Sequence, residues 1–359
     1  MKQLESVLKK ILLNLLVLFN PVKKQYSSPE FETPTNVLFI RLNRIGDALV
    51  STPLFDQIKQ NNNIKIFVLA DKKNHFVFIN NPFIDKVFIF KKGLKGFFEI
   101  NKIIKSHNIS VVVDLHDDVS TSVSYLVAMS KVGYKFALNK SNYKLFTHTV
   151  DKLDSVNNHV IDRVLELLKL FNIKLNRDLV SVKFYPNESD KRIASDKINS
   201  LNPDSKFLIG INISAGSDAR FWGVDNYKKL FSLLTHYKAR IILFSTQKEH
   251  QYCYEITSAD NIYPLTDSFG IFASAIMMMN FIITPDTSVV HLASIKKIPL
   301  FGLYVRYNTT DMIWSPYNTD FEYVLTDEPT LKNISFEEVK NKLVPFLEKH
   351  LNVTSNSCL

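Results

Sequence analysis

The chain has 359 residues, of which 46% are apolar and two are cysteine, and its formal net charge is +9. This length fits two domains of ordinary size, the apolar content excludes wholesale disorder, and two cysteines exclude a disulfide framework, so we expect a protein of a reducing, cytoplasmic compartment. The positive charge either serves solubility alone or favours anionic partners, and the absence of zinc-finger spacing and of an RNA-binding aromatic signature argues against nucleic acid.

The first 35 residues predict an amphipathic extension followed by a linker. An apolar run at 11–19 lies between two lysine pairs. It is shorter than the roughly 20 apolar residues that span a bilayer, and no good signal cleavage site follows it. Residues 1–26 therefore predict a helix on an anionic membrane surface, and the alternative is a helix packed on the protein's own core. Residues 21–35 are rich in proline and serine, which is typical of a linker.

From residue 36 the chain alternates short apolar strands with segments of helical spacing. In the first half we expect strands at 36–42, 64–70, 86–90 and 110–116, and helices at 53–60, 96–107 and 158–172. Such alternation predicts a parallel sheet with helices on its faces.

The alternation restarts after a break near 185–190. In the second half we expect strands at 206–214, 239–246, 281–286 and 298–304, and helices at 225–238, at 288–297 and from the Ser335–Glu338 capping box to about 349. The predicted organisation is therefore an extension at 1–35, doubly wound halves at 36–185 and 186–335, and a C-terminal helix and tail at 336–359. Ligands bind at the carboxyl ends of parallel strands, so we expect a cleft between the halves.

The first candidate site follows the first strand, at Arg44, Gly46 and Asp47. Gly46 permits a tight turn or the close approach of a ligand. Thr52 and Pro53 indicate either the start of a helix or a kink one turn into it. Asp47 is therefore expected at a strand–helix junction, where it either serves chemistry or only caps the helix.

The second candidate site, at 212–223, also follows a strand. Its small residues include Ser214 and Gly216, whose backbone N–H groups could bind an anion, and Arg220 could supply positive charge. The alternative is a surface loop with a solvated arginine.

The third candidate site, at 284–294, joins a strand to a helix. Asp286, Thr287 and Ser288 lie at the junction and His291 one turn later. The N–H groups and partial positive charge of a helix start suit a pyrophosphate. The alternative is that Asp286 is a cap and His291 is structural. His116, in the segment LHDD, marks a further polar loop after a strand. We find no metal-ligand spacing, no G-x-G-x-x-G dinucleotide motif and no nucleophile elbow.

Together and in this order, these segments resemble glycosyltransferase family 9, the bacterial lipopolysaccharide heptosyltransferases. Residues 41–53 match its opening R-x-x-x-I-G-D-x-x-x-x-T-P pattern, and residues 286–293 match D-T-G-x-x-H-L-A. The small-residue loop before Trp222 and a later W-x-P at Trp314 match as well. Two positions depart from the pattern: Ser288 replaces a glycine, and Gly223 replaces the proline after Trp222. The resemblance covers about residues 36–350.

The resemblance implies a GT-B fold, α/β, with two facing Rossmann-like, doubly wound domains and a cleft between them. It implies an inverting transferase in which Asp47 is the general base and fixed donors stabilise the leaving diphosphate, so that no cofactor and no obligatory metal is expected. The implied donor-binding residues are Ser214, Gly216, Arg220, Glu249, Asp286, Thr287, Ser288 and His291. On the acceptor side they are Arg44, Gly46 and His116.

The resemblance further implies a nucleotide-sugar donor, with ADP-heptose expected, and a lipid-anchored oligosaccharide acceptor such as the lipopolysaccharide core. The enzyme would then work at the inner face of the bacterial inner membrane as a peripheral protein. Two alternatives stay open: a transferase of the same family that uses another nucleotide sugar, and a non-catalytic member that binds nucleotide sugar or lipid.

Overall fold

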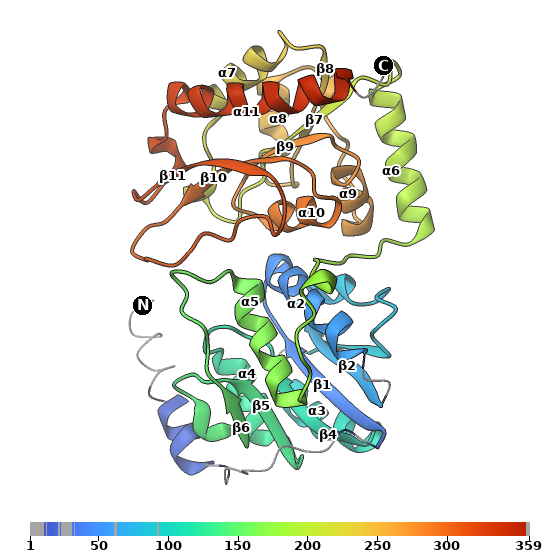
Figure 1. Ribbon diagram of the computed structural model, residues 1–359, viewed down its shortest axis with the longest axis vertical. Coiled ribbons are helices and arrows are strands. Elements are labelled where there is room, and N and C mark those ends of the chain that lie inside the picture. Colours follow the sequence, from blue (N-terminus) through green and yellow to red (C-terminus); the bar gives the residue numbers. More distant parts are fainter. Residues whose placement is uncertain are drawn as a thin grey trace. The chain divides into compact units, whose positions relative to one another are not determined.

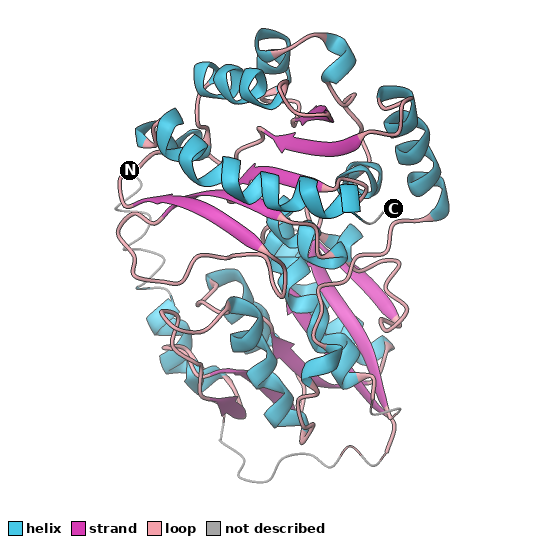
Figure 2. Ribbon diagram, turned by 45° about the horizontal axis from the view of Figure 1, so that its top comes forward, coloured by secondary structure: helices cyan, strands magenta, loops and turns pink. Residues whose placement is uncertain are grey.

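The computed structural model describes residues 11, 13–20, 22, 31, 33–60, 63–91 and 93–356, so most of the predicted extension and linker lies outside the described residues. The chain divides into two compact units, Met1–Lys183 and Phe184–Leu359. Each unit holds one parallel sheet flanked by helices (Figures 1 and 2). Among the described residues, no helix has both the length and the apolar character that crossing a bilayer requires.

The sheet of the N-terminal unit has six parallel strands in the order β3-β2-β1-β4-β5-β6. The strands are β1 (Thr35–Arg41), β2 (Ile64–Asp71), β3 (Lys86–Phe90), β4 (Ile109–Asp114), β5 (Tyr134–Leu138) and β6 (His148–Val150). The four strands predicted for this half are confirmed, and β5 and β6 are additional.

Helices cover both faces of this sheet because side chains alternate along each strand. On one face the ring of Phe39 lies 5.4 Å from Phe55 of α2 and 6.0 Å from Phe171 of η3. On the other face Leu38 and Ile40 pack in one apolar cluster with residues of α3 and α4. The helices are α2 (Ile45–Ile58), α3 (Leu94–Ser106), α4 (Thr121–Met129) and α5 (Val160–Leu165), with short 3₁₀ turns η1 (His75–Val77), η2 (Tyr143–Leu145), η3 (Glu166–Phe171) and η4 (Arg177–Leu179).

Helix α2 begins at Ile45, eight residues before the predicted start at 53, so Pro53 lies inside the helix. Proline has no N–H and cannot bond the carbonyl of Leu49, four residues back. The hydroxyl of Thr52 donates to that carbonyl at 2.7 Å instead. Thr52 and Pro53 thus mark the place inside the helix where one backbone hydrogen bond is missing, and not the start of the helix.

Residues 13–19 are helical. Leu16 and Val17 pack against the apolar cluster beneath α3 and α4, and the backbone N–H of Val22 bonds the carbonyl of Lys144 at 2.9 Å. Leu15, Leu18 and Phe19 are exposed. This helix therefore packs on the protein's own core along one side, as the alternative interpretation expected, and presents apolar side chains on another.

The C-terminal unit has five parallel strands in the order β11-β10-β9-β7-β8. They are β7 (Phe207–Asn212), β8 (Ala239–Phe244), β9 (Phe281–Pro285), β10 (Leu300–Val305) and β11 (Phe321–Thr326). The helices are α6 (Glu188–Leu201), α7 (Val224–Leu234), α8 (His250–Ile256), α9 (Phe269–Ile276), α10 (Ser288–Lys296) and α11 (Phe336–Asn356), with η5 (Asp218–Arg220), η6 (Ala259–Asn261) and η7 (Leu331–Asn333).

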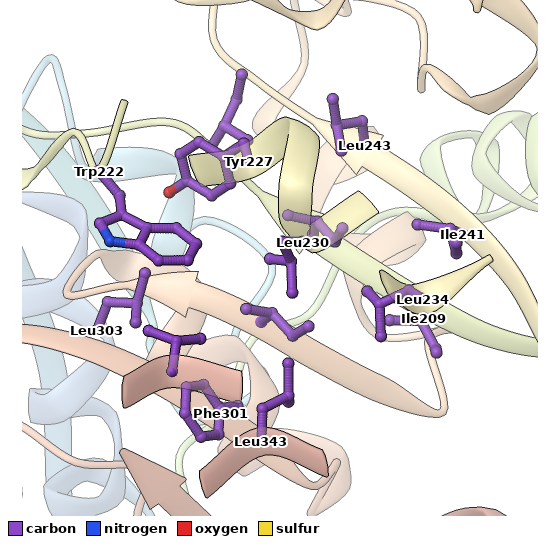
Figure 3. Close-up of a cluster of buried hydrophobic side chains, with 14 of the residues drawn as sticks. Ile209, Trp222, Tyr227, Leu230, Leu234, Ile241, Leu243, Phe301, Leu303 and Leu343 are labelled. Atoms are coloured by element: carbon purple, nitrogen blue, oxygen red, sulfur yellow. The ribbon is translucent and has the colours of Figure 1, made fainter. Parts of the chain in front are cut away.

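The core of this unit is the apolar cluster in Figure 3, which joins the sheet to α7 and α11. Trp222 is fully buried there, and its indole N–H donates to the carbonyl of Ile334 at 2.8 Å. That bond fixes the chain just before α11. The hydroxyl of Ser335 accepts from the backbone N–H of Glu338 at 3.2 Å, as the capping box predicts, and the helix continues to Asn356.

Candidate functional site

Asp47 lies in the first turn of α2, directly after the carboxyl end of β1, and Arg41 holds it there. The Arg41 side chain ends β1 and is only 1% exposed. Its Nε donates to the Asp47 carbonyl at 2.8 Å, and its Nη2 contacts Asp47 Oδ1 at 3.2 Å. Its Nη1 donates to the Leu115 carbonyl at 2.7 Å, which ties the end of β4 to the same guanidinium. The Asp47 side chain keeps 20% of its surface exposed, so it is oriented and still accessible.

Two positive groups lie next to the Asp47 side chain. The start of a helix carries partial positive charge, and the arginine supplies a full one. Burial lowers the pKa of the Arg41 guanidinium, and the carboxylates of Asp47 and Asp114 oppose that shift. Arg41 is therefore a buried cation that acidic neighbours stabilise.

Asp114, at the end of β4, organises a second buried cluster at the same sheet edge. Its Oδ1 contacts His116 Nδ1 at 2.8 Å, and its Oδ2 accepts from Lys140 Nζ at 2.7 Å. Burial alone would raise the pKa of Asp114, but Lys140 and His116 hold it below its usual value. His116 Nε2 contacts the Leu42 carbonyl at 2.7 Å, so both ring nitrogens bond to acceptors.

His116, predicted on the acceptor side, is thus buried, and both of its ring nitrogens contact hydrogen-bond acceptors. Its contact with the Leu42 carbonyl supports the loop after β1. Arg44 is exposed at the start of α2, and Gly46 is half-buried beside Asp47. Sequence reasoning assigned no role to Arg41, Asp114 or Lys140. For Arg41 and Asp114 the available signal was a charged residue at the end of an apolar strand, which burial forces into a pair.

In the C-terminal unit, Asn212 at the end of β7 joins the second and third candidate sites. Its Nδ2 donates to Thr284 Oγ1 at 2.9 Å and to Thr287 Oγ1 at 3.2 Å. Its Oδ1 accepts from the backbone N–H of Ser214 at 3.2 Å and from the Ser214 hydroxyl. Thr287 also caps α10 by accepting from the backbone N–H of Val289 at 3.3 Å. We call these residues, with Arg220 and Asp286, the polar cradle.

Arg220 gives the polar cradle its positive charge. Its Nη2 contacts Asp286 Oδ2 at 2.9 Å, and its Nη1 donates to the Asp286 carbonyl at 3.3 Å. A Cβ placed on Gly216 would lie 3.9 Å from Arg220 Nη1, so the small-residue loop passes beside the guanidinium. The Arg220 and Asp286 side chains are 29% and 22% exposed. The charge is therefore held at the carboxyl end of β9 and remains accessible to solvent.

The remaining predicted donor residues are Ser288 and His291, on α10, and Glu249, after β8. Ser288 is the first residue of α10. His291, one turn later, is buried, and its ring lies 6.0 Å from that of Trp314. Glu249, after β8, is only 2% exposed, and its carboxylate accepts from the Thr246 hydroxyl. Glu249 is therefore buried inside the C-terminal unit. Asn212 and Thr284 open the second and third predicted segments, but sequence reasoning assigned no role to either, because its only signal was a polar residue near the end of each strand.

The two sites differ in what they can do chemically. The polar cradle combines hydroxyls, an arginine and the start of α10, which together suit a diphosphate. The Asp47 site offers an oriented, accessible carboxylate, which suits proton abstraction. Within the described residues, no group of three or more His, Cys, Asp or Glu side chains could hold a metal ion.

Comparison with known proteins gives a consistent result. A sequence profile described as glycosyltransferase family 9 (heptosyltransferase) matches residues 97–343. A protein of Escherichia coli (strain K12), described as a candidate lipopolysaccharide heptosyltransferase 4, is 23% identical over 359 residues, which covers 95% of this chain and 96% of that protein.

Solved structures share the fold. A family 9 glycosyl transferase from Veillonella parvula superposes with a TM-score of 0.73 at 18% identity, covering 92% of this chain and 99% of that one. ADP-heptose lipopolysaccharide heptosyltransferase II of E. coli gives 0.67 at 16% identity, covering 88% and 99%. E. coli heptosyltransferase WaaC with ADP gives 0.66 at 15% identity, covering 88% and 100%. The fold of two parallel-sheet α/β domains is thus the GT-B type.

Proposed function

This chain belongs to glycosyltransferase family 9 and is a glycosyltransferase, and from that premise we propose that it transfers heptose from ADP-heptose to a lipopolysaccharide core or a similar lipid-anchored glycan. The family match over residues 97–343 carries the proposal, because this segment includes the polar cradle. Supporting it, one structural relative is named for ADP-heptose and another contains ADP.

On the donor side, the polar cradle would receive the diphosphate of the nucleotide sugar. Arg220 would stabilise the negative charge that grows on the diphosphate as the glycosidic bond breaks, and the N–H groups at the start of α10 would do the same. Thr287 and Ser288 would add hydroxyl donors there. These fixed donors take the place of a cation, so we propose that no metal ion is obligatory.

On the acceptor side, Asp47 would act as general base. It would remove the proton from an acceptor hydroxyl while that oxygen attacks the anomeric carbon, and the nucleoside diphosphate would leave from the opposite face with inversion. Arg41 would orient this carboxylate through its contact with Oδ1. A general base typically contributes about 10²–10⁴-fold to the rate.

A lipid-anchored acceptor would require the enzyme to work at a membrane surface, which we propose is the inner face of the bacterial inner membrane. The exposed Leu15, Leu18 and Phe19, which follow a lysine pair in the sequence, support this location. Helices of this composition lie on anionic membranes.

A panel of nucleotide sugars tests the donor. We expect ADP-heptose to raise the melting temperature more than UDP- and GDP-sugars do, and to support transfer to a deacylated lipopolysaccharide core with EDTA present. A larger shift and faster transfer with another nucleotide sugar would assign a different donor. Binding of nucleotide sugar without transfer to any glycan acceptor would favour a non-catalytic member.

A further inference from the structure

The two helical layers of the N-terminal unit differ in charge. Within their bounds, α3 and α4 have three lysines, at 95, 102 and 105, and one carboxylate, Glu99, and α4 itself has no charged residue. The opposite layer of α2, α5 and η3 includes four carboxylates, Asp47, Asp56, Asp162 and Glu166, and two basic residues, Arg163 and Lys169. Only the first layer therefore has an excess of positive charge.

The outer side of α3 has an unusual composition for a solvated helix surface. Lys95, Phe98, Lys102 and Lys105 follow one another at spacings of three, four and three residues, which places them along one side. Ile100 and Ile104 on the other side are buried in the core. Phe98, in the middle of the lysines, is 68% exposed.

The lysines of this stripe lack acidic partners. Glu99 lies on the same side of α3, between Lys95 and Lys102, but its carboxylate pairs with Lys91 at 2.9 Å. Within the described part of the chain, no ion pair joins a carboxylate to Lys95, Lys102 or Lys105. Phe98 adds an exposed apolar ring to this positively charged surface. Positive charge around an exposed aromatic ring is the composition of a surface that meets anionic lipid.

The exposed apolar residues of the N-terminal helix belong to the same layer. Residues 13–19 pack through Leu16 and Val17 onto the cluster that α3 and α4 also cover. Asn101 of α3 donates to the carbonyl of Met129 at 2.8 Å, which joins α3 to the end of α4. Residues 13–19, α3 and α4 thus pack on one and the same apolar cluster.

We propose that the outer side of α3, namely Lys95, Phe98, Lys102 and Lys105, is a docking face for an anionic lipid bilayer. This face acts together with the exposed Leu15, Leu18 and Phe19 of the N-terminal helix, and it is a second contact surface in addition to that helix. The inference rests on the proposed function, which places the acceptor in a membrane. The lysines face lipid phosphates, and the Phe98 ring enters the boundary between headgroups and acyl chains.

Binding of the full chain to vesicles tests the docking face. Each lysine near an anionic surface contributes about a fivefold factor in partitioning, so Lys95→Gln/Lys102→Gln/Lys105→Gln should weaken binding to phosphatidylglycerol-containing vesicles about 100-fold. Phe98→Ser should weaken it about tenfold. The wild type should bind pure phosphatidylcholine vesicles weakly, and the lysine variant should bind them about as weakly as the wild type does.

Matched variants of the C-terminal unit separate a docking face from net charge. Lys206→Gln/Lys228→Gln/Lys229→Gln removes the same charge from exposed positions, and Tyr254→Ser removes an aromatic ring that is 60% exposed. We expect both to bind vesicles within about threefold of the wild type. Equal losses in the two triple variants, or wild-type binding by Phe98→Ser, would overturn the docking face.

A second measurement on the same proteins keeps this inference distinct from the proposed transfer. ADP-heptose should raise the melting temperature of the α3 variants as much as that of the wild type. If the wild type binds anionic vesicles through α3 but ADP-heptose produces no shift, the donor assignment fails and the docking face stands. If the shift is present and vesicle binding is unaffected by the α3 variants, the docking face fails alone.

Discussion

The two candidate sites differ in how their charges are held. In the N-terminal unit Arg41, Asp114 and Lys140 form ion pairs whose side chains are at most 4% exposed, apart from Asp47 itself. In the C-terminal unit the polar cradle consists mainly of neutral groups around Asn212, and its ion pair, Arg220 with Asp286, is 29% and 22% exposed.

The difference indicates how far each site can rearrange. Breaking a buried pair by removing one partner costs about 3–5 kcal/mol, whereas an exposed pair contributes about 0–1 kcal/mol. Asp47 is therefore held in one orientation. Arg220 can exchange Asp286 for a phosphate at little cost, because its pair is partly hydrated. The burial of Arg41 and its two backbone hydrogen bonds thus separate the Asp47 pair from the more exposed Arg220–Asp286 pair.

The largest effect expected is that of Asp47→Asn on turnover. Removing the base should lower kcat by about 10²–10⁴-fold, and the affinity for ADP-heptose, measured by calorimetry, should stay within about twofold. Asp118→Asn is the control, because its side chain is 94% exposed at the same sheet edge, and it should retain activity. Wild-type turnover in Asp47→Asn would remove the base from this position.

The next largest effect is that of Arg220→Ala on the donor. A charge-assisted hydrogen bond contributes about 1.5–3 kcal/mol, so donor affinity should fall about 10–100-fold. Lys238→Ala removes an exposed cation at the amino end of β8, where no ligand is expected, and should leave affinity unchanged. If both variants bind the donor as the wild type does, the polar cradle is not the diphosphate site.

A smaller effect is expected for Arg41→Lys, which keeps the charge but loses the three-way contact. We expect kcat to fall about tenfold while donor affinity is unchanged, since lysine cannot hold both Asp47 and the Leu115 carbonyl in the same geometry. An unchanged kcat with a lowered melting temperature would mean that Arg41 only supports the fold.

The smallest effect concerns Asp56 on α2, in the N-terminal unit. Burial raises its pKa to about 6, and Lys183, at 3.8 Å, opposes the shift. The folded state thus holds this proton more tightly than the unfolded chain, so the added stability is complete below about pH 4 and is lost as pH rises through about 6. After allowing for residual exposure, the loss should be at most about 2 kcal/mol. Denaturant unfolding of Asp56→Asn should lack this pH-dependent component, and a slope identical to that of the wild type would contradict it.

Periodicity predicted the central strands because buried parallel strands are continuous apolar runs. It missed β6, which has three residues, and α6, where only Ala194 and Ile198 are buried and the apolar stripe is narrow. It also missed α9, which is apolar on most sides and so lacks a helical alternation.

The candidate sites were predictable where neighbours in sequence are neighbours in space. Asp47 and Thr287 were found as strand–helix junctions. The contacts of Arg41 with Leu115 and of Asn212 with Thr284 join segments 74 and 72 residues apart. Local patterns carry no information about such pairs, so the contacts of Arg41 and Asn212 emerged only from the fold.

Both tryptophans of the chain, Trp222 and Trp314, belong to the C-terminal unit. Intrinsic indole fluorescence therefore reports on that unit alone, and the N-terminal unit, which contains Asp47, has no indole signal. A fluorescence melt compared with one followed by circular dichroism would show whether the two units unfold together. Because Trp314 lies against His291 while Trp222 is locked in the core, quenching by a bound nucleotide would come from Trp314.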